Sequence, residues 1–263
     1  LWQKKEEKER IPLINEAIEV INEGLERCDE TNIKSSYLNT LLIQVLQEVD
    51  IEKANAAAEE LFEKKNDGGG YYTLALNEYY NKSDLISAEN FLDKALKAKI
   101  FPLKAIILKI EIIFKNQNPD YDILLKLANQ LSSSNYVDDW KSAYYKAVIY
   151  TIFGDRYKSS RYFKLSYRLA PPTLQKSIQI FWMDSGSRKI LSGRIGTSFT
   201  IREGRIYPHT VTGYDGEIFF IPQQQKFRSL LGSGLPINFE LGFSPRGPIA
   251  FELKPQNFKV KDK

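Results

Sequence analysis

The C-terminal third of the chain contains four short apolar or aromatic runs, KILSGRI (189–195), REGRIYP (202–208), GEIFFI (216–221) and PRGPIAFEL (245–253). Glycine or proline borders each run, and both residues favour tight turns and interrupt regular structure. Short strands separated by such turns are typical of a small antiparallel barrel. We therefore expect a β-barrel at this end of the chain, preceded by helices.

In their order, these runs resemble a cold-shock domain, a barrel of the OB-fold class that binds single-stranded nucleic acid. The fourth strand is expected at residues 234–241, and the turn and fifth strand at residues 245–250, where the family has a Lys/Arg-Gly-Pro-x-Ala pattern. The resemblance implies a five-stranded antiparallel barrel over residues 188–258. It also implies that an outward strand face stacks bases.

The second and third strands of the resemblance carry the expected stacking residues. Arg205 and Tyr207 match the two outward aromatic positions of the family's second strand, with Ile206 pointing inward between them. Phe219 matches the outward stacking phenylalanine of the third strand, and Phe220 matches a core position. This assignment uses the alternation of successive side chains across a strand.

The chain also departs from the family. The first strand lacks the family's tryptophan, and Phe199 is the nearest aromatic residue to follow it. Ile221 stands where the family has a histidine, and Pro222 replaces the last aromatic residue of the third strand. Two interpretations stay open: a weakened nucleic-acid-binding face, or a face converted to protein docking.

The candidate nucleic-acid site combines rings with basic residues. Stacking is assigned to Tyr207, Phe219 and Arg205, further contacts to Phe199 and His209, and phosphate contacts to Arg194, Arg202, Lys226 and Arg228. Rings stack on bases of any sequence, and cations neutralise the backbone.

Positive charge is concentrated toward the C-terminal end. The net charge is +4, yet residues 185–263 hold 12 basic residues against 6 acidic ones, and residues 140–176 hold 8 against 1. In the second stretch, four basic residues at helical spacing share one helix face: Lys158, Arg161, Lys164 and Arg168. This face is either an ordinary solvated surface or an extension of a nucleic-acid track.

Residues 11–184 have apolar residues at helical spacing and repeat with a nearly constant period. Positions 54, 88, 124 and 159 mark the same place in successive units and are separated by 34, 36 and 35 residues. The clearest unit has small and aromatic residues around a Gly-Asp turn, at Ala143, Tyr150, Gly154, Asp155, Ser159, Phe163, Ser166 and Pro171.

This pattern resembles the tetratricopeptide repeat, in which small residues let paired helices approach closely. It implies an α-helical repeat solenoid over residues 1–184, continuing N-terminally in a longer parent protein, and a fold class of α + β in separate domains. Another family of helical solenoid is the alternative.

The repeat array is expected to bind a protein partner. Five tyrosines lie on the first helices of the units and are candidate interface anchors: Tyr72, Tyr79, Tyr80, Tyr144 and Tyr145. For Tyr79, and for Tyr150 further along the chain, packing between repeats is the favoured expectation. Residues 173–184 are expected to form a capping or connecting helix. Residues 184–187 read as a linker short enough to dock the barrel on the last repeat, and residues 66–70 as the most flexible segment.

Catalysis is not expected. The one histidine, His209, and the one cysteine, Cys28, lie far apart in the sequence and in different predicted domains, so they form no catalytic pair or metal site. Gly68-Gly69-Gly70 lacks the Lys and Ser/Thr of a phosphate-binding loop. No apolar run reaches the ~18 residues of a membrane span. We expect no cofactor, metal or membrane partner, and the single cysteine favours an intracellular, cytoplasmic setting.

The sequence therefore predicts a non-enzymatic module that binds RNA or single-stranded DNA through its barrel and a protein through its helices. A pure protein-interaction scaffold with a degenerate OB-fold is the second hypothesis. A third is the recognition end of a larger effector whose catalytic domain precedes Leu1.

Overall fold

The computed structural model describes residues 7–31, 35–133, 139–196, 204–208, 218–221, 225, 229 and 231–256. The chain forms two compact units, Leu1–Ile112 and Ile113–Lys263. Every described element of the first unit is a helix apart from short turns and one isolated bridge, whereas the second unit combines helices with a barrel.

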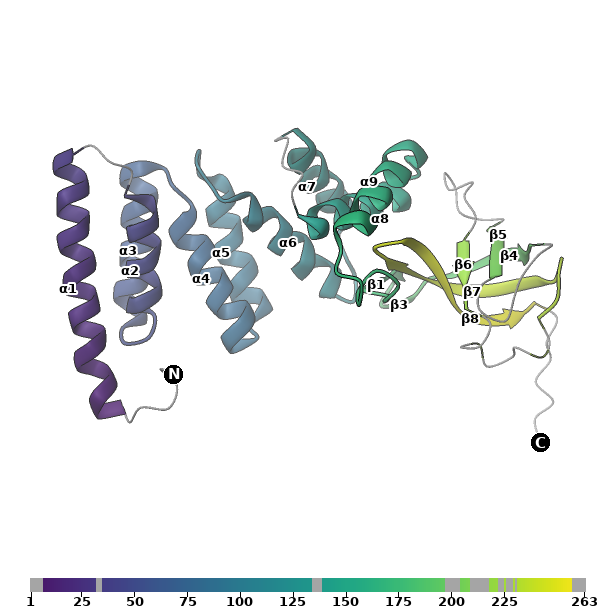
Figure 1. Ribbon diagram of the computed structural model, residues 1–263, viewed down its shortest axis with the longest axis horizontal. Coiled ribbons are helices and arrows are strands. Elements are labelled where there is room, and N and C mark those ends of the chain that lie inside the picture. The colour runs from purple at the N-terminus through teal and green to yellow at the C-terminus, as the bar shows by residue number, and fades with distance from the viewer. Residues whose placement is uncertain are drawn as a thin grey trace. The chain divides into compact units, whose positions relative to one another are not determined.

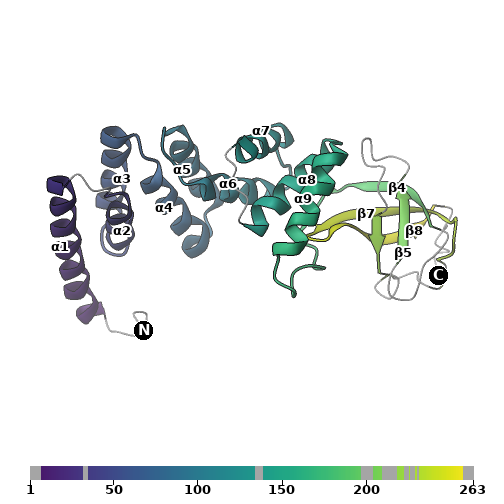
Figure 2. The same ribbon diagram turned by 45° about the horizontal axis from the view of Figure 1, so that its top comes forward.

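Helices of the first unit pack in chain order. They are α1 (Glu7–Thr31), α2 (Ser36–Leu46), α3 (Ile51–Lys65), α4 (Gly69–Asn77), the π-helix η2 (Glu78–Lys82), α5 (Leu85–Lys97) and α6 (Leu103–Lys115), which continues into the second unit. Figures 1 and 2 show α2 beside α3 and α4 beside α5. Short connections make such neighbours antiparallel pairs.

Aspartate side chains begin two of these helices. An Asp50 carboxylate oxygen accepts the Lys53 N–H at 3.0 Å at the start of α3. Asp84 accepts the N–H groups of Ile86 and Ser87 at 3.1 and 3.0 Å at the start of α5. These bonds satisfy backbone donors that have no partner inside the helix.

The glycines at the start of α4 permit close packing. A Cβ atom on Gly68 would lie 2.3 Å from the Ala95 carbonyl oxygen, and one on Gly70 would lie 2.8 Å from Ile43 Cδ1. Residues 67–70 are buried. The expectation that this segment is the most flexible part of the array is therefore wrong, because its glycines let the backbone approach neighbouring helices.

In the second unit, the helices are α7 (Tyr121–Ser133), α8 (Trp140–Ile152) and α9 (Arg156–Leu169). The predicted Gly-Asp turn separates α8 from α9, with Gly154 at φ 78°. Asp155 then accepts the Lys158 N–H at 3.0 Å and begins α9. The helix break predicted from this dipeptide is confirmed.

The evenly spaced positions of the sequence are all buried. They lie in α3, α5, α7 and α9, and each is 0% exposed: Ala54, Ala88, Leu124 and Ser159. Small residues at three of the four places let the helices of a pair approach closely. The evenly spaced positions therefore mark fully buried places in four helices of this region.

The strands of the second unit are β1 (Ile180–Phe181), β2 (Met183–Asp184), β3 (Ser187–Arg188), β4 (Ile190–Ile195), β5 (Gly204–Pro208), β6 (Ile218–Phe220), β7 (Pro236–Ser244) and β8 (Gly247–Pro255). Five of the described strands close a barrel in the order β4-β5-β6-β8-β7, with β7 pairing back to β4. The β6–β8 pair is parallel, with Phe219 opposite Ile249. The barrel is therefore mixed, and the fully antiparallel prediction is wrong on this pair.

Two further sequence expectations are corrected near the start of the barrel. The helix predicted over residues 173–184 does not form: residues 172–177 make turns and a bend, and β1 and β2 follow. β1 pairs with β7 at Ile180–Phe243 and Phe181–Gly242. Residues 184–187 are not a linker but the turn of the β2–β3 hairpin. Ser185 and Gly186 have φ values of 49° and 79° there, as in a type I′ turn.

The barrel is docked on the helices of its own unit. The Tyr144 hydroxyl in α8 donates to the Phe243 carbonyl at 2.9 Å. The rings of Phe163 in α9 and Phe243 in β7 are stacked at 6.5 Å, and the Arg246 N–H donates to the Gln175 carbonyl at 3.1 Å. These contacts confirm the predicted docking of the barrel on the last helical pair.

Candidate nucleic-acid interface

The outward face of β4, β5 and β6 carries the residues predicted to stack bases. Arg205 lies directly opposite Phe219, and Arg194 lies directly opposite Tyr207. The alternating residues Ile206, Ile218 and Phe220 are fully buried in the barrel, while Arg194, Arg205 and Tyr207 are exposed. The predicted inward and outward assignment on these strands is therefore confirmed.

Tyr207 offers the most open ring of this face, with 47% of the residue exposed. Its ring packs beside Gly196, where a Cβ atom would lie 3.2 Å from Tyr207 Cε2. The Gly196 N–H donates to the Arg205 carbonyl at 2.8 Å and fixes this end of β4 beside β5. A glycine under the ring supports it without covering the rest of its surface.

Phe219 is half-buried and has guanidinium groups near its ring. Arg246 lies 4.5 Å from the ring centroid and Arg205 lies 5.5 Å from it. Both distances fit a cation–π contact. The Phe219 ring is therefore held between neighbouring strands with two guanidinium groups within cation–π range.

A small cavity of about 80 Å³ opens beside Phe219. Lys176, Ser244, Arg246 and Ile249 are among the residues that line it. The described lining contains two basic side chains and no acidic one. The sequence does not predict either basic residue as part of the site, because Arg246 belongs to the turn pattern at residues 245–250 and Lys176 lies outside the barrel.

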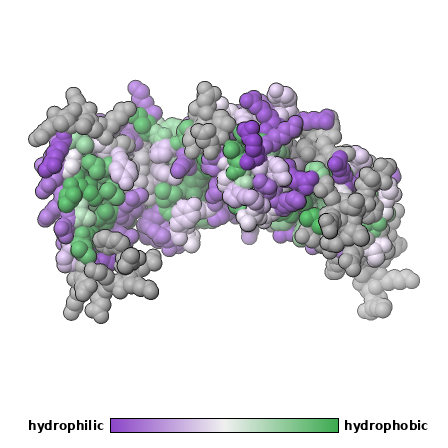
Figure 3. Space-filling view, in the orientation of Figure 1, coloured by the Kyte–Doolittle hydropathy of each residue, from purple (hydrophilic) through white to green (hydrophobic). Residues whose placement is uncertain are grey.

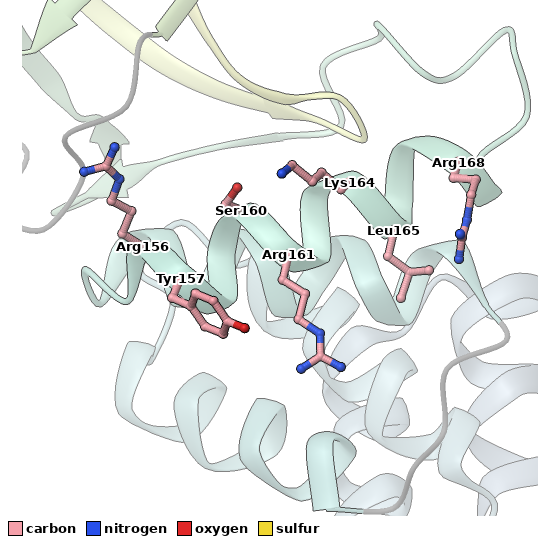
Figure 4. A pocket seen from close by; sticks show the side chains of 7 residues that line it. All are labelled: Arg156, Tyr157, Ser160, Arg161, Lys164, Leu165 and Arg168. Atoms are coloured by element: carbon pink, nitrogen blue, oxygen red, sulfur yellow. The ribbon is translucent and has the colours of Figure 1, made fainter.

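The outer face of α9 forms an open groove rich in basic side chains. The groove has a volume of about 1020 Å³, and seven residues of the described part of the chain line it: Arg156, Tyr157, Ser160, Arg161, Lys164, Leu165 and Arg168. Figure 4 shows Arg156, Ser160 and Lys164 directed to one side of the helix and Tyr157 and Arg161 to the other. Hydrophilic side chains gather over this part of the surface in Figure 3.

The structure brings three of the four predicted track residues into this groove. Lys158 lies apart from them, because its Nζ pairs with Asp155 at 3.1 Å and sits 4.7 Å from the Tyr150 ring centroid. Arg156 joins the groove instead. The sequence does not predict Arg156 as part of the set, because it lies only two residues before Lys158 and does not fit the spacing of three or four residues.

The remaining candidates lie outside the described residues: Phe199, Arg202, His209, Lys226 and Arg228. Arg194 is described, and its Nη1 donates to the Gly234 carbonyl at 3.4 Å. This bond ties β4 to the turn before β7. The described part of the interface therefore consists of Tyr207, Phe219, Arg194 and Arg205, together with Lys176 and Arg246.

A second surface lies in the first unit, in a groove of about 900 Å³ between α1, α2 and η2. Its lining is rich in amide side chains: Gln44, Gln47, Asn77 and Asn81. Its charged residues are paired, Arg10 with Glu48 and Lys82 with Glu78. Gln47 Nε2 is buried without a hydrogen-bond partner.

Four of the tyrosines discussed above are buried, and one lines this groove. Tyr79 and Tyr150 are buried, as expected for packing residues, and so are Tyr144 and Tyr145. Tyr80 lines the groove and is 62% exposed. Its position in the π-helix η2 is notable because single π-turns are frequent at functional sites.

Within the described ranges, no three His, Cys, Asp or Glu side chains gather in a way that would hold a metal ion. No helix in the described part of the chain combines the length and apolarity needed to cross a membrane. In the comparisons with known proteins, no family model and no curated protein matches this chain.

Proposed function

We propose that the second unit binds RNA or single-stranded DNA across the outward face of β4, β5 and β6. The observation that carries this proposal is that the exposed Tyr207 ring and the half-buried Phe219 ring share one strand face. Arg194 lies directly opposite Tyr207, and Arg205 lies directly opposite Phe219. The described residues of these three strands include no acid. A face of rings and cations without carboxylates suits a polyanion whose bases are unpaired.

In this proposal the barrel is an OB-fold of the cold-shock type. Closure of five short strands into one barrel, with β4 pairing with both β5 and β7, supports this assignment. Bases stack on Tyr207 and Phe219, while the guanidinium groups contact phosphates. The groove on α9 adds positive charge along the path of the bound nucleic acid.

The helical region acts as a scaffold of tetratricopeptide-like repeats, and the module is not an enzyme. The buried small residues at repeating positions support the repeat assignment. Docking of the barrel on α8 and α9 gives the binding face a rigid support.

Salt titration tests the proposed function. Labelled oligo-U RNA and oligo-dT DNA are titrated with the protein at low and at near-physiological salt, and fluorescence anisotropy gives the affinity. Binding should weaken steeply with salt, because each phosphate contact in a single strand contributes roughly 0.7 to the slope of log K against log salt. No binding at low salt contradicts the proposal and favours a protein-docking barrel.

The groove of the first unit favours a second candidate function, the binding of an extended peptide. Amide side chains carry one donor group and one acceptor, as a peptide backbone does, so Gln44, Gln47, Asn77 and Asn81 can pair with a bound main chain. A photo-cross-linker at Tyr80 should then capture a partner protein. The same group at Ile86, an exposed residue of α5, should not.

A further inference from the structure

The cavity beside Phe219 joins two parts of the second unit that are distant in the sequence. Lys176 follows α9, and Arg246 lies in the turn between β7 and β8. The Arg246 N–H donates to the Gln175 carbonyl at 3.1 Å, and Gln175 Nε2 donates to the Tyr167 carbonyl at 3.1 Å. Both basic residues are therefore carried on backbone that is hydrogen-bonded in place.

The turn that carries Arg246 is itself fixed. The Ser244 hydroxyl donates to the Gly247 carbonyl at 3.1 Å, and Ser244 pairs with Gly247 across the β7–β8 hairpin. Gly247 has a φ of 145°, which favours glycine. These bonds fix the backbone that carries Arg246 at the rim of the cavity, so that less conformational freedom is lost when a ligand binds.

The size and charge of the cavity select its ligand. About 80 Å³ corresponds to roughly three molecules of liquid water, enough for the oxygens of one phosphate and too little for a nucleoside. Two basic side chains and no acid among the described lining residues favour an anion. An arginine guanidinium binds phosphate with paired hydrogen bonds, and a lysine adds a point charge.

We infer that this cavity binds one phosphate group of the strand held on the barrel, between Lys176 and Arg246. The inference rests on the proposed function and deepens it. Phe219 borders the cavity and belongs to the stacking face, so a base stacked there has its phosphate next to the two cations. Either a terminal phosphate or a backbone phosphate supplies this chemistry.

Charge-neutral variants test the inference in the full chain. Lys176→Gln removes one exposed charge at the cavity, and Lys254→Gln removes one exposed charge from β8 as a matched control. Affinities are measured by anisotropy for oligo-dT with a 5′-hydroxyl, a 5′-phosphate or a 3′-phosphate. Lys176→Gln should weaken binding about tenfold, as loss of a charged hydrogen bond does, and Lys254→Gln should weaken it less than about twofold.

The oligonucleotides distinguish the source of the phosphate. A preference of the parent for a phosphorylated end that Lys176→Gln abolishes supports a terminal phosphate. Equal weakening on all three oligonucleotides supports a backbone phosphate. Equal affinities of Lys176→Gln and Lys254→Gln overturn the inference while leaving base stacking on the barrel intact.

Inorganic pyrophosphate separates this inference from the proposed function. If the parent binds no oligonucleotide, the proposed function fails, and the cavity is tested by thermal unfolding with pyrophosphate. A stabilisation that Lys176→Gln loses and Lys254→Gln keeps supports the anion site alone. No stabilisation of the parent overturns the inference as well.

Discussion

Gly204 and Phe220 set the orientation of the binding face at the level of single residues. They are paired across β5 and β6, and a Cβ atom on Gly204 would lie 2.3 Å from two atoms of the Phe220 ring. The buried Phe220 ring therefore occupies the space that a side chain at 204 would need. Because neighbours alternate across a strand, its inward position directs Phe219 outward.

Gly204→Ala should consequently destabilise the barrel by about 1–3 kcal/mol or more, since overpacking forces the ring or the strands apart. Gly232→Ala is the matched control, because nothing lies within 4 Å of a Cβ atom placed there. Urea unfolding gives the free energy of each variant. Equal stability of the two variants contradicts the packing described for Phe220.

Lys146 in α8 is a buried lysine whose charge opposes folding. Only 2% of the residue is exposed, and burial lowers its pKa from 10.5 to about 8. Its Nζ donates to the Leu131 carbonyl at 3.2 Å and lies 5.1 Å from the Tyr162 ring centroid. Between pH 8 and 10.5 the unfolded chain holds this proton while the folded protein releases it, so this group makes the protein more stable as pH rises.

Lys146→Met should therefore stabilise the protein by about 1–3 kcal/mol at pH 7, because no buried ammonium has to be desolvated. The advantage over the parent should shrink as the pH approaches 10. Parallel urea unfolding of parent and variant at both pH values measures this, and it cancels the ionisation of tyrosines common to both. An advantage that grows with pH would contradict the assigned pKa direction.

At the level of elements, α9 starts directly after its capping residue, Asp155, and exposes a basic face. Asp155 accepts the Lys158 N–H at the helix start, and this backbone hydrogen bond is the main cause of its lowered pKa. The stabilisation is present above the unfolded pKa of 3.8 and is lost as the pH falls through the folded pKa.

Asp155→Ala should cost about 1 kcal/mol at pH 7, the usual value of a helix cap, and less at pH 2.5, because a protonated carboxyl is a weaker cap than a carboxylate. Asp155→Asn should keep most of the stability, because an asparagine also caps, and should lose the pH dependence. Thermal unfolding at the two pH values measures both variants. A constant penalty for Asp155→Ala across this range would show that the carboxylate does not act as the cap.

If the basic face of α9 contacts phosphates, it contributes to the salt dependence of oligonucleotide binding. Arg161→Gln/Lys164→Gln/Arg168→Gln should lower the slope of log K against log salt for oligo-dT by up to about 2, since each lost phosphate contact removes roughly 0.7. The control removes three exposed charges elsewhere, with Lys97→Gln/Lys104→Gln/Lys126→Gln. An unchanged slope in the α9 variant would identify this face as an ordinary solvated surface.

Some features of the helices and strands can be predicted from the sequence, and others cannot. The inward and outward residues of β5 and β6 follow from the period of two in a strand, and the buried positions 54, 88, 124 and 159 follow from a repeat period. The sequence predicts a helix over residues 173–184, because a short apolar run fits either a helix or a strand. Pairing of β1 with β7 resolves that ambiguity, and only the fold reveals it.

The molecule as a whole creates a site that no sequence window contains. Lys176 and Arg246 are 70 residues apart, and they share a cavity only because the β7–β8 turn packs on the segment after α9. The parallel pairing of β6 with β8 likewise depends on barrel closure rather than on local pattern. In the second unit, α8, α9 and the barrel therefore pack as one body, with the two helices supporting the strands that carry the rings.

The central proposal for the second unit is that bases stack on the rings of Tyr207 and Phe219. Fluorescence anisotropy compares the parent with Tyr207→Ala/Phe219→Ala on labelled oligo-U and oligo-dT at one low salt concentration. Tyr37→Ala/Ile86→Ala removes two exposed apolar side chains from the first unit as the control. Far-ultraviolet circular dichroism checks folding, and Tyr207→Ala alone tests the exposed ring if the double variant unfolds.

Two lost base stacks at roughly 1–3 kcal/mol each predict at least about 30-fold weaker binding for the double variant, and at least about fivefold for Tyr207→Ala. The control should bind as the parent does. A folded double variant with the parent's affinity would contradict the assignment of this face as a stacking platform for single-stranded nucleic acid.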